Sequence, residues 1–232
     1  MKKTGISTFN QLGKRCSLMS VILVSALTGL TACDPITPFI AGGLIAGTAL
    51  TVSDRRTSGI QIEDKAISSK ANSRIRETLG EKVHVNSNAY NLRLLLTGEV
   101  PDEATKAEVE KIASGVENVR YIVNELSITG QSSTTSRAND VFITSKVKAA
   151  LIDEKTLSVN AFLIATERGT VYLMGRVTER EAKIAAEVAS RVSGVQKVVK
   201  VMEIISDADL AEFNKKYGPV KDASKTDTTS KN

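Results

Sequence analysis

The pattern of apolar and polar positions in the second half of the chain predicts one small α/β unit. Apolar side chains recur at helical spacing within residues 141–151, which indicates an amphipathic helix. The segments 157–166 and 170–177 are rich in β-forming residues, and the turn residues between them are typical of a hairpin. A second helix and a last strand over 198–205 complete the order helix, strand, strand, helix, strand.

The second helix carries its own start and stop signals. Thr178 and Glu181 have the spacing of a capping box at its start, and Gly194 is expected at the C′ position after its end. Earlier in the chain, Asp102 and Gly115 are expected to play these two roles for another helix. Because a helix joins the last two strands, those strands should be parallel where they neighbour each other.

The chain contains an internal repeat, which makes this unit occur twice. Three blocks recur in the same order at a spacing of about 76 to 79 residues. The matched blocks are residues 64–70 with 140–146, 95–100 with 172–177, and 112–116 with 191–195.

The pattern divides the chain into six parts. We expect a signal segment over 1–32, a lipidated cysteine and apolar tether over 33–62, a first domain over 63–129, a linker over 130–138, a second domain over 139–205, and a tail over 206–232. The tail pattern allows a short helix near its start, and its later Lys, Ser, Thr and Asp run predicts that it is largely disordered.

The N-terminal segment predicts export and lipidation. A basic stretch precedes the apolar run 18–27, and residues 30–33, Leu-Thr-Ala-Cys, resemble the lipobox of bacterial lipoproteins. We therefore expect Cys33 to carry the lipid. The alternative is an ordinary signal sequence, or an uncleaved anchor, that happens to end in a cysteine. Asp34 resembles a signal for retention in the inner membrane, so inner-membrane retention stays open although we favour the outer membrane.

The stretch that follows predicts a tether. Residues 35–52 are apolar and rich in Gly and Ala, but prolines and glycines weaken any helix there. A tether lying near the lipid surface is therefore favoured over a second spanning segment.

Composition changes this picture little. The formal net charge is +5, and four cationic residues upstream of Cys33 supply most of it, leaving +1. The basic balance is therefore mainly a targeting feature, and we expect no nucleic-acid partner. Cys16 lies in the signal segment, so with Cys33 acylated no cysteine pair remains for a disulfide.

The repeated unit resembles the BON domain. The order of elements, the glycine after the apolar run of the second strand and the Ser-Gly-Val helix exit carry the resemblance, together with stretches 177–183 and 189–195. With its signal, lipobox and tether, the whole chain resembles envelope lipoproteins that hold two BON domains. The resemblance implies an α+β fold in which each domain packs a small three-stranded mixed sheet on two helices.

Candidate chemistry is sparse. His84 is the only histidine and lies in a predicted strand, and no nucleophile motif or phosphate-binding glycine loop occurs. We therefore expect no enzyme activity, no catalytic residue, no metal site, no cofactor and no small-molecule substrate.

The first helix of the second domain is the candidate binding surface. Phe142 stands where the first copy has Ala66, about 100° around the helix from the core stripe. An aromatic flanked by Lys146 and Lys148 resembles a membrane-surface helix. Alternatively, Phe142 packs between the two repeats. Residues 137–205 carry a net charge of +3, whereas residues 63–129 carry −2.

The family resemblance favours the membrane interpretation. It implies binding of anionic phospholipid through this helix, and the predicted site is Val141, Phe142, Ser145, Lys146 and Lys148. The expected function is a periplasm-facing lipoprotein that helps maintain the outer membrane. The alternative is a structural adaptor that uses the same face to bind an envelope protein.

Overall fold

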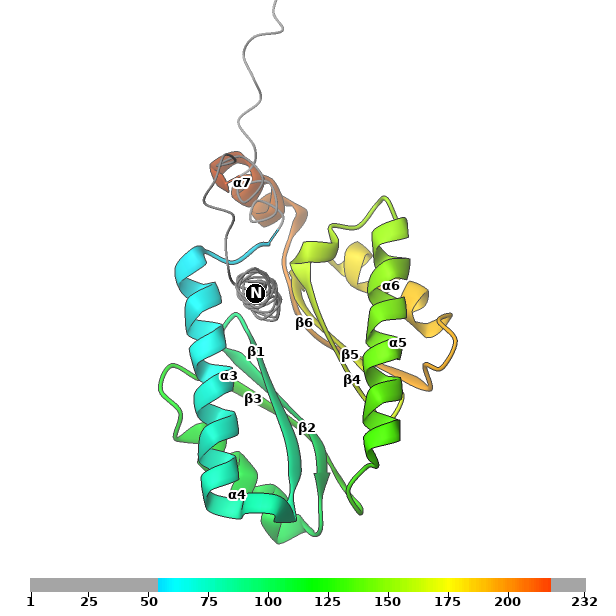
Figure 1. Ribbon diagram of the computed structural model, residues 1–232. Coiled ribbons are helices and arrows are strands. Elements are labelled where there is room, and N and C mark those ends of the chain that lie inside the picture. The colour runs from blue at the N-terminus through cyan, green and yellow to red at the C-terminus, as the bar shows by residue number, and fades with distance from the viewer. Residues whose placement is uncertain (1–53, 218–232) are drawn as a thin grey trace, which may run out of the picture. The chain divides into compact units, whose positions relative to one another are not determined.

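The computed structural model describes residues 54–217 (Figure 1). The expected signal segment 1–32, Cys33, Asp34 and most of the tether lie outside the described residues, as does the end of the tail, 218–232. Within the described range, every helix falls short, in length or in apolar character, of what a membrane-spanning segment requires.

Two sets of five elements follow one another, each in the expected order. The first set is α3 (Ser58–Leu79), β1 (His84–Tyr90), β2 (Arg93–Val100), α4 (Glu103–Ser114) and β3 (Tyr121–Ile128), with a 3₁₀ turn at Gly80–Lys82. The second set is α5 (Thr134–Asp153), β4 (Phe162–Glu167), β5 (Thr170–Val177), α6 (Glu179–Ser190) and β6 (Lys197–Ile204), with a 3₁₀ turn at Val159–Ala161. A last helix, α7 (Asp207–Tyr217), forms the described part of the tail.

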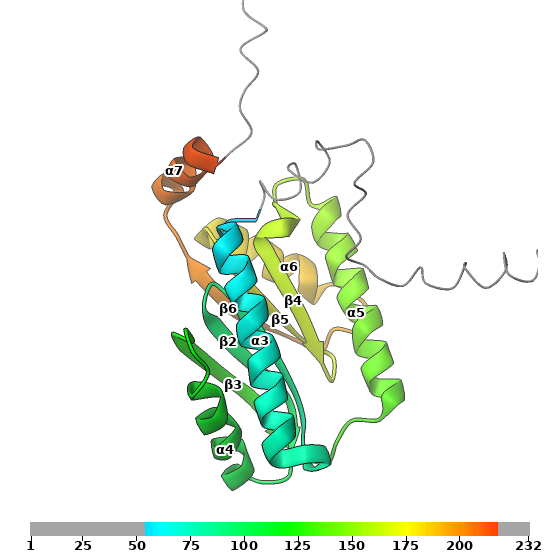
Figure 2. The same cartoon turned by 60° about the vertical axis from the view of Figure 1, so that its left-hand side comes forward.

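Each domain has a three-stranded mixed sheet with its second strand in the centre. β2 pairs antiparallel with β1 and parallel with β3, and β5 pairs in the same way with β4 and β6. Figures 1 and 2 show α5 and α6 together on one face of the β4–β5–β6 sheet. The α+β fold expected from the repeat is therefore confirmed.

Both faces of the two central strands are buried. One hydrophobic cluster packs α3 and α4 on the first sheet, and a second packs α5 and α6 on the second sheet. A third cluster combines residues of both domains, and its buried members are Tyr90, Leu95, Tyr172, Met174 and Val201. Because β2 and β5 are covered on both sides, they are almost continuously apolar rather than alternating.

One glycine in each central strand is required by the approach of the neighbouring backbone. A Cβ at Gly98, whose φ is +121°, would lie 2.0 Å from the carbonyl oxygen of His84. A Cβ at Gly175 would lie 2.6 Å from the carbonyl oxygen of Ala161. The repeated glycine of the sequence therefore marks a place where no side chain fits.

Several predicted boundaries differ from the structure. α3 begins at Ser58 and α5 at Thr134, before the expected domain starts, because the hydroxyls of Thr57 and Ser133 cap them. The expected strand 157–166 begins only at Phe162, after a 3₁₀ turn. The capping box of Thr178 and Glu181 is confirmed.

The predicted glycine C′ positions are wrong. Gly115 is the C-cap itself, with a φ of −79°, and α6 already ends at Ser190 with Arg191 as its C-cap. The left-handed residue beyond each helix is Asn118 in the first domain and Gly194 in the second, with φ of 66° and 99°. The two Ser-Gly-Val sequences therefore occupy different positions relative to the helix end in their domains. The corresponding elements of the two domains still follow each other at a nearly constant spacing along the chain.

Candidate membrane-binding surface

Helix α5 exposes an apolar face opposite its core. The side chains of Ile143, Val147 and Leu151 are buried in the second cluster. Phe142 is 60% exposed and Ile152 is 57% exposed. Because each helical residue turns by about 100°, these two side chains lie on the side of the helix away from that core.

Three further exposed residues complete this face. Val141 is 67% exposed, and Ser145 and Lys148 are also exposed. The hydroxyl of Ser145 donates to the carbonyl oxygen of Val141 within the helix. We call the set Val141, Phe142, Ser145, Lys148 and Ile152 the α5 surface.

Lys146 lies at the flank of the α5 surface and contacts its aromatic residue. Its Nζ lies 4.9 Å from the centroid of the Phe142 ring, a cation–π distance. The same ammonium group donates to the carbonyl oxygen of Ser193. Lys146 is thereby held beside Phe142, while Lys148 extends into solvent.

The structure brings all five predicted site residues to one side of α5. None of them belongs to the cluster that joins the two domains, so Phe142 does not pack between the repeats as the alternative held. Ile152, which lies one helical turn beyond Lys148, was not among the residues predicted from the sequence. Its spacing of eleven residues from Val141 was the available signal, since eleven residues bring a helix back close to the same face.

The corresponding helix of the first domain lacks this surface. At a spacing of 76 residues, Val141, Phe142 and Ile152 correspond to Lys65, Ala66 and Arg76 of α3. The side chain of Ile62, 70% exposed, is the most exposed large apolar residue on α3. Continuous exposed apolar surface on a first helix is therefore a property of the second domain.

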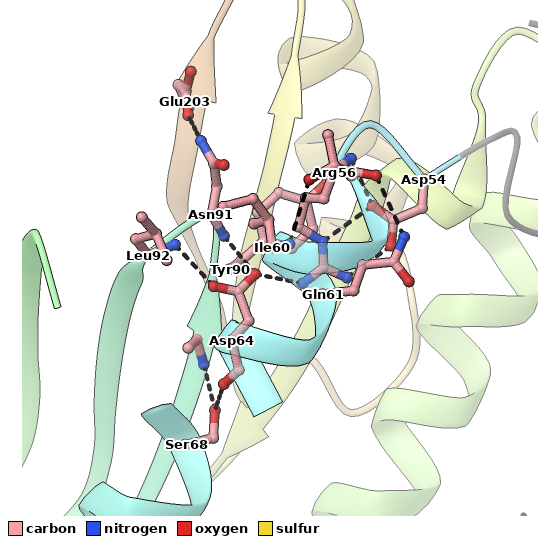
Figure 3. Close-up of polar contacts among 12 residues, drawn as sticks. Asp54, Arg56, Ile60, Gln61, Asp64, Ser68, Tyr90, Asn91, Leu92 and Glu203 are labelled. Carbon is pink, nitrogen blue, oxygen red and sulfur yellow. Dashed lines mark hydrogen bonds and ion pairs between the residues drawn. The ribbon is translucent and has the colours of Figure 1, made fainter. Parts of the chain in front are cut away.

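Two arginines at the start of the described residues, Arg55 and Arg56, bind this part of the chain to the two domains. Arg55 donates to Glu181 at 2.6 and 2.7 Å and to the carbonyl oxygen of Arg176 at 3.0 Å, all in the second domain. Arg56 donates to Asp54 and to Asp64 of the first domain, where the distance is 2.8 Å (Figure 3). The start of the described chain is thus bound to both domains.

These ion pairs set the ionisation of the buried groups. Burial raises the pKa of the Glu181 carboxyl, but the hydrogen bonds and charge of Arg55 outweigh it, so the pKa is lowered. Burial lowers the pKa of Arg56, and its bonds to Asp54 and Asp64 more than reverse that effect. Glu181 and Arg56 are therefore charged at neutral pH.

Two further hydrogen bonds connect the domains. Asn91, in the β1–β2 turn, donates through its side-chain amide to Glu203 of β6 (Figure 3). The hydroxyl of Tyr90 donates to the carbonyl oxygen of Ala161 at 3.1 Å. With the shared cluster, these contacts hold the second domain, and with it α5, against the first.

One group of described residues has the donor atoms of a metal site, although no metal site was predicted from the sequence. The imidazole of His84 lies beside the carboxylates of Glu99 and Glu167, with the ligand atoms all within 4.8 Å of one another. None of the three belongs to the α5 surface.

Comparison with known families identifies the repeated unit. The family model described as BON domain matches residues 63–130 and again residues 139–206. The chain belongs to the BON-domain family. Both matches coincide with the two sets of elements in the structure.

Similar proteins occur in other bacteria. The outer membrane lipoprotein DolP of Haemophilus influenzae is 33% identical over 186 residues, which are 79% of this chain and 94% of DolP. The 21 kDa hemolysin of Actinobacillus pleuropneumoniae is 30% identical over 66% of this chain and 79% of its own length. Osmotically-inducible protein Y of Escherichia coli is 26% identical over 59% of this chain and 70% of its own length.

Proposed function

We propose that this chain is a lipid-anchored envelope protein whose second domain binds anionic phospholipid through the α5 surface and so helps to maintain the outer membrane. The observation that carries the proposal is Phe142, exposed on the side of α5 away from the core and accompanied by Val141, Ile152, Lys146 and Lys148. The similarity to an outer membrane lipoprotein supports the envelope location.

The α5 surface has the chemistry of a helix that lies in a membrane interface. Burying an aromatic side chain contributes about 2 kcal/mol, and each cation near an anionic surface contributes about 1 kcal/mol. A few such groups give reversible binding. An acyl group at Cys33 would supply the second signal that stable anchoring requires.

The first domain has a different role in this proposal. Lys65, Ala66 and Arg76 replace the apolar residues of the α5 surface, so its first helix offers no matching apolar face. Its bonds through Tyr90 and Asn91 instead fix the second domain in place. Neither domain is proposed to catalyse a reaction or to bind nucleic acid or a small-molecule substrate.

Flotation with vesicles tests the proposal. Every residue of the three hydrophobic clusters lies between Ile60 and Met202, so a chain expressed as residues 54–232 keeps both cores without the lipidated cysteine. It should float with phosphatidylglycerol-containing vesicles, and less of it should float as the salt concentration rises. It should not float with phosphatidylcholine vesicles. Equal behaviour with both vesicles would favour the adaptor alternative, in which the α5 surface binds an envelope protein.

A further inference from the structure

A histidine and two glutamates meet where the two domains touch. His84 opens β1 and pairs directly with Glu99 of β2, so their side chains share one face of the sheet. Glu167 ends β4 of the second domain. Nδ1 of His84 lies 2.9 Å from Oε2 of Glu99 and 3.9 Å from Oε1 of Glu167.

Both carboxylates are buried, and one oxygen lacks a hydrogen bond. Glu99 has no exposed surface, and the side chain of Glu167 is 8% exposed. Ser132 donates its backbone N–H and its hydroxyl to Oε2 of Glu99. Among the described residues, no donor makes a hydrogen bond to Oε1 of Glu99. A buried carboxylate oxygen left in this way is costly unless positive charge reaches it.

The nearest protein cation compensates this charge only in part. Nη1 of Arg168 lies 3.5 Å from Oε1 of Glu99, and its side chain is 46% exposed. Asn86 donates to the other oxygen of Glu167 at 2.9 Å, but as a neutral amide. Two buried carboxylates thus share one imidazole and one partly exposed guanidinium.

The donor set is that of a transition-metal site, and the ligand atoms all lie within 4.8 Å of one another. One imidazole nitrogen and two carboxylate oxygens suit Zn²⁺, which binds such atoms at about 2.0–2.2 Å. Ligand atoms around one zinc ion then lie roughly 3.5 Å apart, between the two separations from Nδ1 of His84. His84, Asn86 and Glu81 also line a polar cavity of about 280 Å³.

We propose that His84, Glu99 and Glu167 bind one divalent cation of the zinc class at the junction of the two domains. The ion would neutralise both buried carboxylates and join the first sheet to the β4–β5 hairpin of the second domain. A water molecule would fill the fourth position. This site is independent of the α5 surface and of lipid binding.

Zinc competition with the full chain tests the site. The chain is purified in detergent, stripped with a chelator and titrated with Zn²⁺ against a chromophoric chelator. We compare the wild type with His84→Gln and Glu167→Gln. Glu203→Gln is the matched control, because Glu203 also bonds across the domains, to Asn91, but lies outside the cluster. The cysteines outside the cluster are the same in all four proteins, so differences in zinc binding between the proteins report the cluster.

The proposal predicts one more tightly bound zinc ion per chain in the wild type and in Glu203→Gln than in the two cluster variants. Zinc should also raise the thermal unfolding midpoint of the wild type more than that of His84→Gln. Thermal melts followed by circular dichroism without metal identify which variants fold. One folded cluster variant is enough to test the zinc site. Equal zinc binding by the wild type and a folded cluster variant would overturn the site and leave an ion-pair cluster only.

Discussion

Asp64 and Asp140 hold the hairpin turns of the two domains in the same way. The carboxylate of Asp64 accepts the backbone N–H groups of Asn91 and Leu92, both at 2.8 Å. The carboxylate of Asp140, 76 positions later, accepts those of Arg168 and Gly169 at 2.9 and 2.8 Å. All four turn residues have positive φ. A buried aspartate on the first helix therefore stabilises a left-handed turn that most residues disfavour.

Replacing Asp140 by alanine should destabilise the second domain. Two buried N–H groups would lose a charged acceptor, and we expect the free energy of unfolding to fall by about 3 kcal/mol. Urea denaturation of residues 54–232 measures the effect. Asp153→Ala, at the exposed end of α5, is the control and should change stability little. Equal losses in the two variants would contradict the role of the turn contact.

Alanine should not be tolerated at the two strand glycines. Gly98→Ala would place a Cβ 2.0 Å from the backbone of His84, and Gly175→Ala would place one 2.6 Å from that of Ala161. Both should lower the thermal unfolding midpoint, Gly98→Ala more because its φ is also positive. Gly130→Ala, with no neighbouring atom within 4 Å, should leave it nearly unchanged. Wild-type melting of Gly98→Ala would refute the close approach.

The ion pair of Arg55 and Glu181 should contribute stability that depends on pH. Both side chains are buried, so Arg55→Met should cost about 3 kcal/mol at pH 7 by leaving Glu181 unpaired. The pKa of Glu181 is lowered in the folded chain, so its contribution is present above the ordinary pKa of glutamate. It is lost as the pH falls through the lowered pKa.

Chemical denaturation at several pH values measures this effect. The difference in unfolding free energy between the wild type and Arg55→Met should be full at pH 7 and shrink in acid, below the ordinary pKa of a glutamate. Lys65→Met, an exposed cation on α3, is the control and should show a small difference throughout. A difference for Arg55→Met that stays constant into acid would show that packing, rather than charge, stabilises the contact.

Local signals in the sequence predicted much of the fold because they act over a few residues. The capping box of Thr178 and Glu181 needs only its own turn of helix, and the residues Arg168 and Gly169 mark a hairpin between two adjacent strands. The Ser-Gly-Val match led to the wrong glycine C′ positions because the same three residues lie in different surroundings in the two domains. Gly194 lies against Ile143 of α5, and a Cβ there would come within 3.0 Å of it.

Contacts between the domains could not be read from spacing along the chain. The pairing of His84 with Glu99 follows from the position of the β1–β2 turn and was available in principle. Glu167 reaches them only because the two domains pack together, and no local pattern encodes that packing. The α5 surface could be predicted in part. Helical periodicity places Val141 and Ile152 on one face, but only the packing of both domains shows that this face stays uncovered.

Flotation of Phe142→Glu tests the central claim most directly. Residues 54–232 carrying this substitution are compared with the wild type on phosphatidylglycerol-containing vesicles, and Ile62→Glu, at an exposed position on α3, is the control. Loss of an apolar anchor of about 2 kcal/mol, together with a new negative charge, should weaken binding at least about tenfold. The control should bind like the wild type. Undiminished flotation of a folded Phe142→Glu chain would contradict lipid binding through the α5 surface.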